Sequence, residues 1–254
     1  METETIKKGF HFQESNHSYT FDGKKLTGVT SVLGKVLAKP ALIPWASKMA
    51  CEYIKEHGNK VYYESDLLHY EVTEKQLDEA RTAHAQKRDN AADFGKLQHS
   101  IIEGYVNNCL ENKGKPIIQE TGSKHLKTFM DWAFANDITF IATEAMFWSD
   151  HLWLAGTADL VFEKDGKRCI GDVKIKKKIY GKEPFLQMAA YHMLSESMEN
   201  PKGEWSLVLR IDPETAELEE LWSKNVTEDR EAFLQVLAIY RYLDAGKKYG
   251  KTNH

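Results

Sequence analysis

The alternation of hydrophobic and polar residues predicts hairpins and helices in the first half of the chain. Aromatic and polar residues alternate around the turn DGKK, which indicates a hairpin over residues 10–36 that runs into a short helix. Residues 41–70 have a helical tendency. Thr73 and Gln76 resemble a helix start, so a long helix is expected to run over 74–110.

Beyond residue 122 the pattern changes from a helix to strands. A stripe of apolar residues at i, i+3 and i+4 predicts an amphipathic helix over 122–136. It precedes an antiparallel meander of three strands, which leads to a helix, a hairpin around Asp212-Pro213-Glu214 and a final helix. The expected strands lie at 138–148, 151–163, 167–175, 204–211 and 217–222, and the last two helices at 185–199 and 227–243.

These elements predict a single compact α+β domain, because no internal repeat, low-complexity tract or linker interrupts them. Within it we expect an N-terminal hairpin and helical elaboration over 1–90 and a core over 91–246. The last residues, 247–254, are expected to fray.

The composition is that of an ordinary globular protein, with 254 residues, 42% hydrophobic content and a formal net charge of −4. Neither a membrane span nor a secretory signal is predicted, so an intracellular, cytoplasmic location without a membrane partner is expected. The three cysteines are far apart, which argues against a zinc ribbon, an iron–sulfur cluster and a disulfide framework. The net charge excludes a strongly basic DNA coat but leaves room for a local positive groove.

The residues that point most clearly to chemistry lie on two successive predicted strands. Asp159 follows the small residues Gly156-Thr157-Ala158, which let a metal ion or a phosphate approach the strand closely, although it also fits a polar strand end. On the next strand, period-2 alternation places Asp172 and Lys174 on one face. A carboxylate there can ligate a cation while the ammonium orients or helps deprotonate an attacking water. The same pair also fits an exposed ion pair on a sheet face.

Two further features accompany this pair. Gln187 and Tyr191 share a face of the following helix, where they can hydrogen-bond the lysine or a phosphate, although Tyr191 fits a core position equally well. The lysine run that includes Lys176 and Lys178 suits a rim that contacts phosphates, and it also fits a solvated strand end.

Upstream, His99 and Glu103 lie four residues apart on the long predicted helix and offer an imidazole and a carboxylate on one face. Imidazole suits Mn²⁺ better than Mg²⁺, so a histidine ligand would predict strong activity with Mn²⁺. A structural histidine is the alternative.

The order Gly95…His99, Glu144, Gly156-Thr157-x-Asp159, Asp172-x-Lys174 and Gln187-x-x-x-Tyr191 resembles the PD-(D/E)XK nuclease superfamily in its RecB-like exonuclease branch. The resemblance spans residues 95–191, and the segment HSYTFDGKKLTGVTSVLG is similar to the lead-in of phage-type members. It implies a restriction-endonuclease-like core, with a central mixed β-sheet flanked by helices and the His99 helix packed across it.

The resemblance also implies roles for individual residues. His99, Asp159, Asp172 and the Val173 carbonyl are expected to ligate Mg²⁺ or Mn²⁺. Lys174 is then the catalytic lysine, Gln187 and Tyr191 line the substrate groove, and Glu144 is an additional catalytic or metal-site residue whose role is less defined. Two features depart from the pattern: Ile175 stands where a small hydroxyl residue is common, and the four-cysteine signature of an iron–sulfur cluster is missing.

Together these observations predict a metal-dependent DNA exonuclease that hydrolyses phosphodiester bonds and prefers single-stranded or frayed ends. A structure-selective endonuclease would use the same residues. A non-catalytic DNA-binding or assembly subunit could keep the fold with a silent site. The sequence predicts DNA as the partner and gives no oligomeric state.

Overall fold

The structure is a computed structural model that describes residues 9–62 and 68–245. The contacts between residues divide the chain into two compact units, one made of residues 1–37 and 98–254 and the other of residues 38–97. These divisions fall after residues 37 and 97, whereas the sequence suggested a boundary near residue 90. The tail expected to fray, 247–254, lies outside the described residues.

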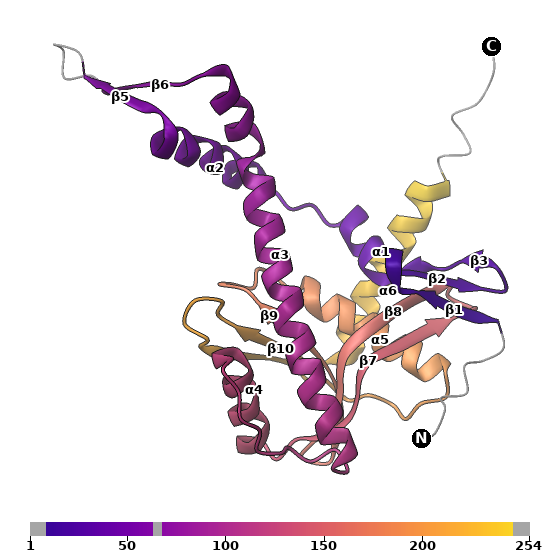
Figure 1. Cartoon of the computed structure of the whole chain (residues 1–254). Coiled ribbons are helices and arrows are strands. Elements are labelled where there is room, and N and C mark those ends of the chain that lie inside the picture. The colour runs from indigo at the N-terminus through magenta and orange to yellow at the C-terminus, as the bar shows by residue number, and fades with distance from the viewer. Residues whose placement is uncertain (1–8, 63–67, 246–254) are drawn as a thin grey trace, which may run out of the picture. The chain divides into compact units, whose positions relative to one another are not determined.

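The larger unit is built on a six-stranded mixed sheet (Figure 1). Its strands are β4 (Thr27–Gly28), β7 (Thr139–Ser149), β8 (Leu154–Lys164), β9 (Lys167–Ile175), β10 (Trp205–Ile211) and β11 (Leu218–Ser223). The predicted antiparallel meander is confirmed in β7, β8 and β9, and the predicted hairpin in β10 and β11. The chain then crosses from β9 to a parallel β10, and β4 pairs in parallel with the start of β8, a pairing that the sequence did not predict.

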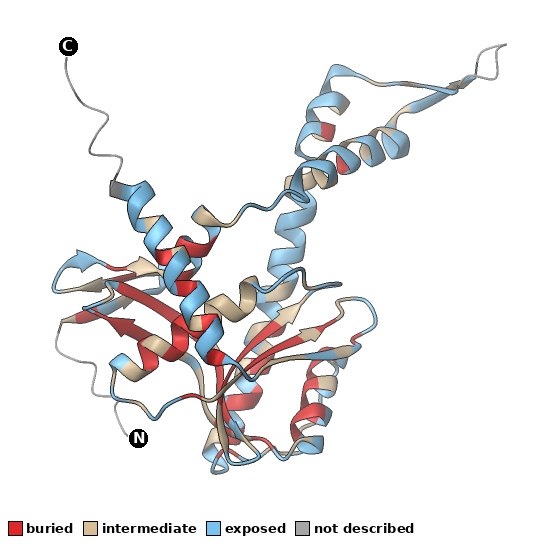
Figure 2. Ribbon diagram, turned by 180° about the vertical axis from the view of Figure 1, so that it is seen from behind, coloured by how far each residue is buried: buried red, intermediate tan, exposed pale blue. Residues whose placement is uncertain are grey.

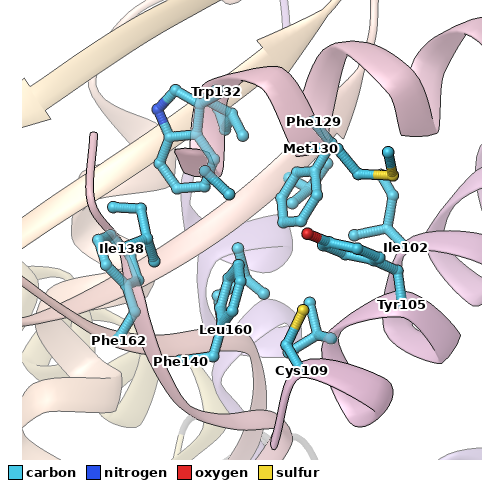
Figure 3. Close-up of a cluster of buried hydrophobic side chains, with 14 of the residues drawn as sticks. Ile102, Tyr105, Cys109, Phe129, Met130, Trp132, Ile138, Phe140, Leu160 and Phe162 are labelled. Atoms are coloured by element: carbon cyan, nitrogen blue, oxygen red, sulfur yellow. The ribbon is translucent and has the colours of Figure 1, made fainter. Parts of the chain in front are cut away.

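Helices cover both faces of this sheet, as predicted. The helices of the larger unit are α1 (Val29–Val36), α4 (Lys124–Ala135), α5 (Glu183–Ser197), α6 (Val226–Ala245) and the second part of α3 (Glu74–Glu111). Side chains of α3 and α4 pack on one face in a cluster with Phe140, Leu160 and Phe162 (Figure 3). Side chains of α1, α5 and α6 pack on the other face with Val161 and Val208.

Alternation along the central strands explains this two-sided core. Phe162 of β8 belongs to the α3–α4 cluster, whereas its neighbour Val161 belongs to the α1–α5–α6 cluster. On β9, Val173 belongs to the α3–α4 cluster and Ile170 to the α1–α5–α6 cluster. A strand that is buried on both faces needs apolar residues at nearly every position, so a polar residue within it is exceptional. The α+β class with a mixed central sheet flanked by helices is confirmed.

The predicted N-terminal hairpin is also confirmed. It consists of β1 (Phe10–Gln13), the 3₁₀ turn Glu14–Asn16, β2 (Ser18–Phe21) and β3 (Lys24–Lys25). Tyr19 and Leu26 are buried in a cluster with Trp148 of β7 and Ala155 of β8. This packing holds the hairpin against the sheet, and the chain then enters β4 and the short helix α1.

The smaller unit corrects one prediction. Residues 41–70 were expected to be helical, but α2 (Leu42–His57) ends at Gly58 and a hairpin of β5 (Asn59–Tyr62) and β6 (Leu68–Glu71) follows. Gly58 has extended backbone angles, and a Cβ there would lie 2.7 Å from the Ile54 carbonyl oxygen, so the chain leaves the helix at this glycine.

The start of α3 in the smaller unit agrees with the sequence. The Thr73 backbone N–H donates to Oε1 of Gln76 at 2.8 Å, and the Gln76 N–H donates back to Oγ1 of Thr73 at 3.2 Å. This reciprocal pair is the predicted capping box. Figure 2 shows that buried residues concentrate in the sheet and helices of the larger unit, whereas most of the smaller unit is exposed. Within the described ranges, no helix is long and apolar enough to cross a membrane.

Candidate active site

The acidic residues predicted on two strands meet at the β8–β9 pairing. Asp159 lies on β8 and Asp172 on β9, and the register pairs the next residue of β8, Leu160, with Gly171. The Val173 backbone N–H donates to Oδ2 of Asp159 at 2.9 Å. This hydrogen bond crosses between the strands and fixes the Asp159 carboxylate beside the segment that carries Asp172.

Asp172 and Lys174 form a close ion pair. Nζ of Lys174 donates to Oδ1 of Asp172 at 2.8 Å and lies 2.7 Å from Oδ2, a buried atom that receives no hydrogen bond of good geometry. Asp172 is 2% exposed, so the pair is not the solvated surface pair that the sequence left open. A buried carboxylate needs a cation close by, and here the ammonium supplies it.

His99 reaches this site from α3. Its Nδ1 lies 3.5 Å from Oδ2 of Asp159. Burial lowers the pKa of His99, and the nearby Lys174 ammonium lowers it further, while the charge of Asp172 and a backbone hydrogen bond with Val173 act in the opposite direction. The lowered pKa favours the neutral imidazole, which is the form that ligates metals.

Glu144 of β7 lies near the same site, since its charge acts on Asp159, and its backbone is strained. Its neighbours Thr143 and Ala145 pair with β8, but Glu144 itself has a φ of +47°, a region that non-glycine residues seldom occupy and that clusters at functional sites. Burial raises the pKa of the Glu144 carboxyl, and the charges of Glu103 and Asp172 raise it further. Glu103, which was noted in the sequence only as a helix neighbour of His99, therefore lies close enough to influence this site.

The charges around Asp159 leave the site short of positive charge. Burial and the charge of Asp172 raise the pKa of Asp159 well above its usual value, despite the opposing influence of Lys174 and of the Val173 hydrogen bond. Burial alone would lower the pKa of Lys174, but Asp172 and Asp159 outweigh it, so the pKa is raised and the amine is protonated. One ammonium thus serves several carboxyl groups.

Tyr191 and Gln187 lie together on α5. Nε2 of Gln187 donates to the Tyr191 hydroxyl at 2.9 Å. The Tyr191 ring is 3% exposed, as the core alternative expected, and burial raises the pKa of its hydroxyl. The ring packs against Gly156 of β8, where a Cβ would lie 2.4 Å from Cε1 of Tyr191. Tyr191 therefore sets the position of the strand segment that leads to Asp159.

This close approach predicts the effect of a substitution. Gly156→Ala should lower the free energy of unfolding by about 1–3 kcal/mol, because the added methyl group overlaps the buried Tyr191 ring. Urea denaturation measures the change. As a control, Gly104→Ala on α3 adds a methyl group where no atom lies within 4 Å, and it should stabilise the chain by about 0.5–1 kcal/mol. A Gly156→Ala variant as stable as the wild type would contradict this packing.

The predicted phosphate-contacting lysines, Lys176 and Lys178, follow directly after β9, and both are exposed. Between them, Nζ of Lys177 pairs with Oε1 of Glu214 at 2.6 Å. The structure therefore brings together His99, Glu144, Asp159, Asp172 and Lys174. Gln187 and Tyr191 lie together on α5, and the two lysines follow β9.

A small pocket next to these residues was not predicted from the sequence. Its volume is about 200 Å³, and hydroxyl groups of the N-terminal hairpin, the start of α1 and β8 line it together with Tyr191. The Tyr19 hydroxyl lies 2.8 Å from Oγ1 of Thr157 and 2.9 Å from Nε2 of His17. Thr157 precedes Asp159 by two residues on β8, so the pocket adjoins the acidic site. The only sequence signal was Thr157 itself, within the Gly-Thr-x-Asp pattern.

Comparisons with known proteins add a weak structural likeness. The sequence matches no protein-family model and no curated protein. An alkaline exonuclease (LHK-Exo) from Laribacter hongkongensis is similar in structure with a TM-score of 0.37 and 8% identity, over 88% of this chain and 94% of that one. The structure of LHK-Exo in complex with dAMP is similar with a TM-score of 0.30 and 10% identity, over 90% of this chain and 95% of that one.

A third structure, that of the protein SSO0001, is similar with a TM-score of 0.27 and 13% identity. The similar region covers 45% of this chain and 57% of SSO0001. At these identities and TM-scores, the likeness does not assign the chain to a family.

Proposed function

We propose that this protein is a divalent-metal-dependent deoxyribonuclease that removes nucleotides from DNA ends, with a preference for single-stranded or frayed ends. The observation that carries the proposal is the buried Asp172–Lys174 pair beside Asp159 and His99. Gathering a buried carboxylate with a half-buried carboxyl group, imidazole and ammonium costs stability, and such a cost is common at sites that perform chemistry.

The donor groups fit Mg²⁺ or Mn²⁺. Among the residues that the structure describes, no set of three or more His, Cys, Asp and Glu side chains already stands in a metal-binding arrangement. However, Oδ2 of Asp172 is a buried oxygen without a hydrogen bond, and Asp159 and His99 lie within reach of each other. Carboxylate oxygens with one imidazole suit Mn²⁺ and, less well, Mg²⁺.

In the proposed enzyme, Asp159, Asp172, His99 and the Val173 carbonyl hold the cation. When bound, the cation supplies Lewis-acid polarisation of the phosphate and neutralises charge that develops during hydrolysis. Lys174, whose ammonium lies against both carboxylate oxygens of Asp172, would share that carboxylate with the cation. Lys174 then orients the attacking water and stabilises negative charge on the phosphate oxygens.

The small pocket supports a preference for chain ends. The start of α1 has no side-chain cap, and its first residues line a pocket that hydroxyl groups and His17 also line. Such a lining suits a phosphate group, and no Asp or Glu side chain contributes to it. Its volume admits one phosphate or a small part of a nucleotide but not a continuous duplex.

The test is hydrolysis of end-labelled single-stranded DNA with Mn²⁺, compared with a circular single strand of the same sequence. We expect release of nucleotides from the linear strand and sparing of the circle. Cleavage of the circle would instead identify an endonuclease with the same site. DNA binding without hydrolysis of either substrate, in Mg²⁺ and in Mn²⁺, would contradict the enzymatic proposal and favour a non-catalytic DNA-binding subunit.

A further inference from the structure

An arginine of β10 lies directly beside the strand that carries Lys174. In the parallel register of β9 and β10, Arg210 is the partner of Lys174, and across the antiparallel β10–β11 pair it is the partner of Glu219. The Arg210 side chain is 12% exposed. The sequence analysis did not single it out.

The guanidinium group of Arg210 binds the backbone of the lysine-rich segment that follows β9. Nη1 donates to the carbonyl oxygen of Lys176 at 3.3 Å and to that of Lys177 at 3.2 Å. Nε donates to Oε2 of Glu219 at 2.6 Å, which anchors the group from the opposite side. The planar side chain of Arg210 therefore connects the segment that follows β9 to β11.

Two other contacts hold the same segment. The Lys176 backbone N–H donates to the Ile211 carbonyl oxygen at 3.1 Å. The Lys177 ammonium pairs with Glu214, whose turn is fixed because Oδ1 of Asp212 accepts the backbone N–H of Glu214 at 2.8 Å. The lysine-rich segment is thus attached to β10 and to the β10–β11 turn by both its backbone and a side chain.

Arginine suits this position for a chemical reason. Its fork of N–H groups can serve two carbonyl oxygens and a carboxylate at the same time, whereas the single ammonium of lysine cannot span them in this geometry. A lysine at position 210 would keep the charge but lose at least one of the backbone contacts.

We infer that Arg210 is a positioning residue that fixes Lys176–Lys178 next to Lys174, so that the exposed lysines meet the phosphates of a bound DNA strand. This inference rests on the proposed function and deepens it by naming what shapes the substrate-binding segment. Arg210 itself touches backbone and carboxylate groups, so its action on the substrate passes through the segment that it holds.

The experiment compares Arg210→Lys with Arg230→Lys. Arg230 is a matched control because its side chain is 18% exposed and forms a two-pronged pair with Glu196, at 3.0 Å to Oε2 and 2.5 Å to Oε1, on α6 and α5. Each substitution keeps the formal charge and the number of trypsin sites. Both variants are expected to fold with a lower melting temperature, because Arg210→Lys loses the Glu219 hydrogen bond and backbone contacts and Arg230→Lys loses its bidentate pair with Glu196.

Three measurements separate positioning from simple stabilisation. In Arg210→Lys, trypsin should cleave the folded protein after Lys176, Lys177 and Lys178 about tenfold faster, because the segment is less firmly held. The KM for single-stranded DNA should rise about tenfold while kcat stays within about threefold, because substrate contacts are lost and Lys174 is retained. Arg230→Lys should change neither the cleavage rate nor KM.

Unchanged trypsin cleavage and unchanged KM in Arg210→Lys, with only a lower melting temperature, would overturn the inference and leave Arg210 a structural residue. The failure of the proposed function looks different, because the wild type would then hydrolyse no DNA. In that case the trypsin measurement still decides whether Arg210 holds the segment, and fluorescence anisotropy of a labelled oligonucleotide in EDTA replaces KM as the measure of binding.

Discussion

Lys174→Ala is expected to lower the rate of DNA hydrolysis by about 10²–10⁴-fold, because the variant loses the group that we propose orients the water and stabilises charge on the phosphate. It should also lower the free energy of unfolding by about 3–5 kcal/mol, because Asp172 is left as a buried carboxylate without its cation. Single-turnover hydrolysis of end-labelled DNA and urea denaturation measure the two effects.

The two effects of Lys174→Ala can be separated with a double variant. Asp172→Asn combined with Lys174→Met removes both charges and keeps similar shapes, so it should recover most of the lost stability while staying inactive. Since this variant is expected to fold well, inactivity cannot be blamed on unfolding. Activity within tenfold of the wild type, in either variant, would remove Lys174 from the catalytic assignment.

Asp159→Asn should lower hydrolysis by at least about 10²-fold and yet raise the free energy of unfolding of the metal-free protein by about 1 kcal/mol at neutral pH. The gain arises because the substitution removes a carboxylate that is only 20% exposed and is repelled by Asp172. The asparagine oxygen can still accept the Val173 N–H.

The pH dependence follows from the raised pKa of Asp159. In the unfolded chain the pKa of the Asp159 carboxyl is about 3.9. In the folded protein its pKa is higher, so the carboxyl keeps its proton to higher pH. Its contribution to stability is therefore fully present below the unfolded pKa and is lost as the pH rises through the folded pKa. The wild type in EDTA should lose stability relative to Asp159→Asn over this interval, as followed by thermal unfolding at several pH values.

A control and a second measurement sharpen the test of Asp159. Asp131→Asn removes an exposed carboxylate that pairs with Lys127 on α4, so it should change stability by less than about 0.5 kcal/mol and leave hydrolysis unchanged. Addition of Mn²⁺ should raise the melting temperature of the wild type and of Asp131→Asn but not of Asp159→Asn. An Mn²⁺ response that Asp159→Asn retains would exclude Asp159 as a ligand.

The sequence was informative where local patterns determine position. Period-2 alternation correctly placed Asp172 and Lys174 together and Val173 on the opposite side, in the core. The short turns of the predicted meander correctly made β8 and β9 neighbours, which brings Asp159 to Asp172. Each of these inferences needed only a few consecutive residues.

Features that depend on distant contacts were missed. The left-handed φ of Glu144 arises within the paired strands β7 and β8, and no turn signal marks it in the sequence. The role of Arg210 depends on the parallel register of β9 and β10, which alternation alone does not give. The helical tendency of residues 41–70 hides the β5–β6 hairpin, because its short strands follow directly after α2.

The pairing of β4 with β8 has a consequence for how the chain is made. A ribosome delivers β4 long before β8, and the whole of the smaller unit is synthesised between them. The parallel strand β10 emerges later still, after α5. Because such non-local pairings form slowly, β9 gains its parallel partner β10 only near the end of synthesis. A nascent chain therefore carries Asp159, Asp172 and Lys174 for some time before the sheet around them is complete.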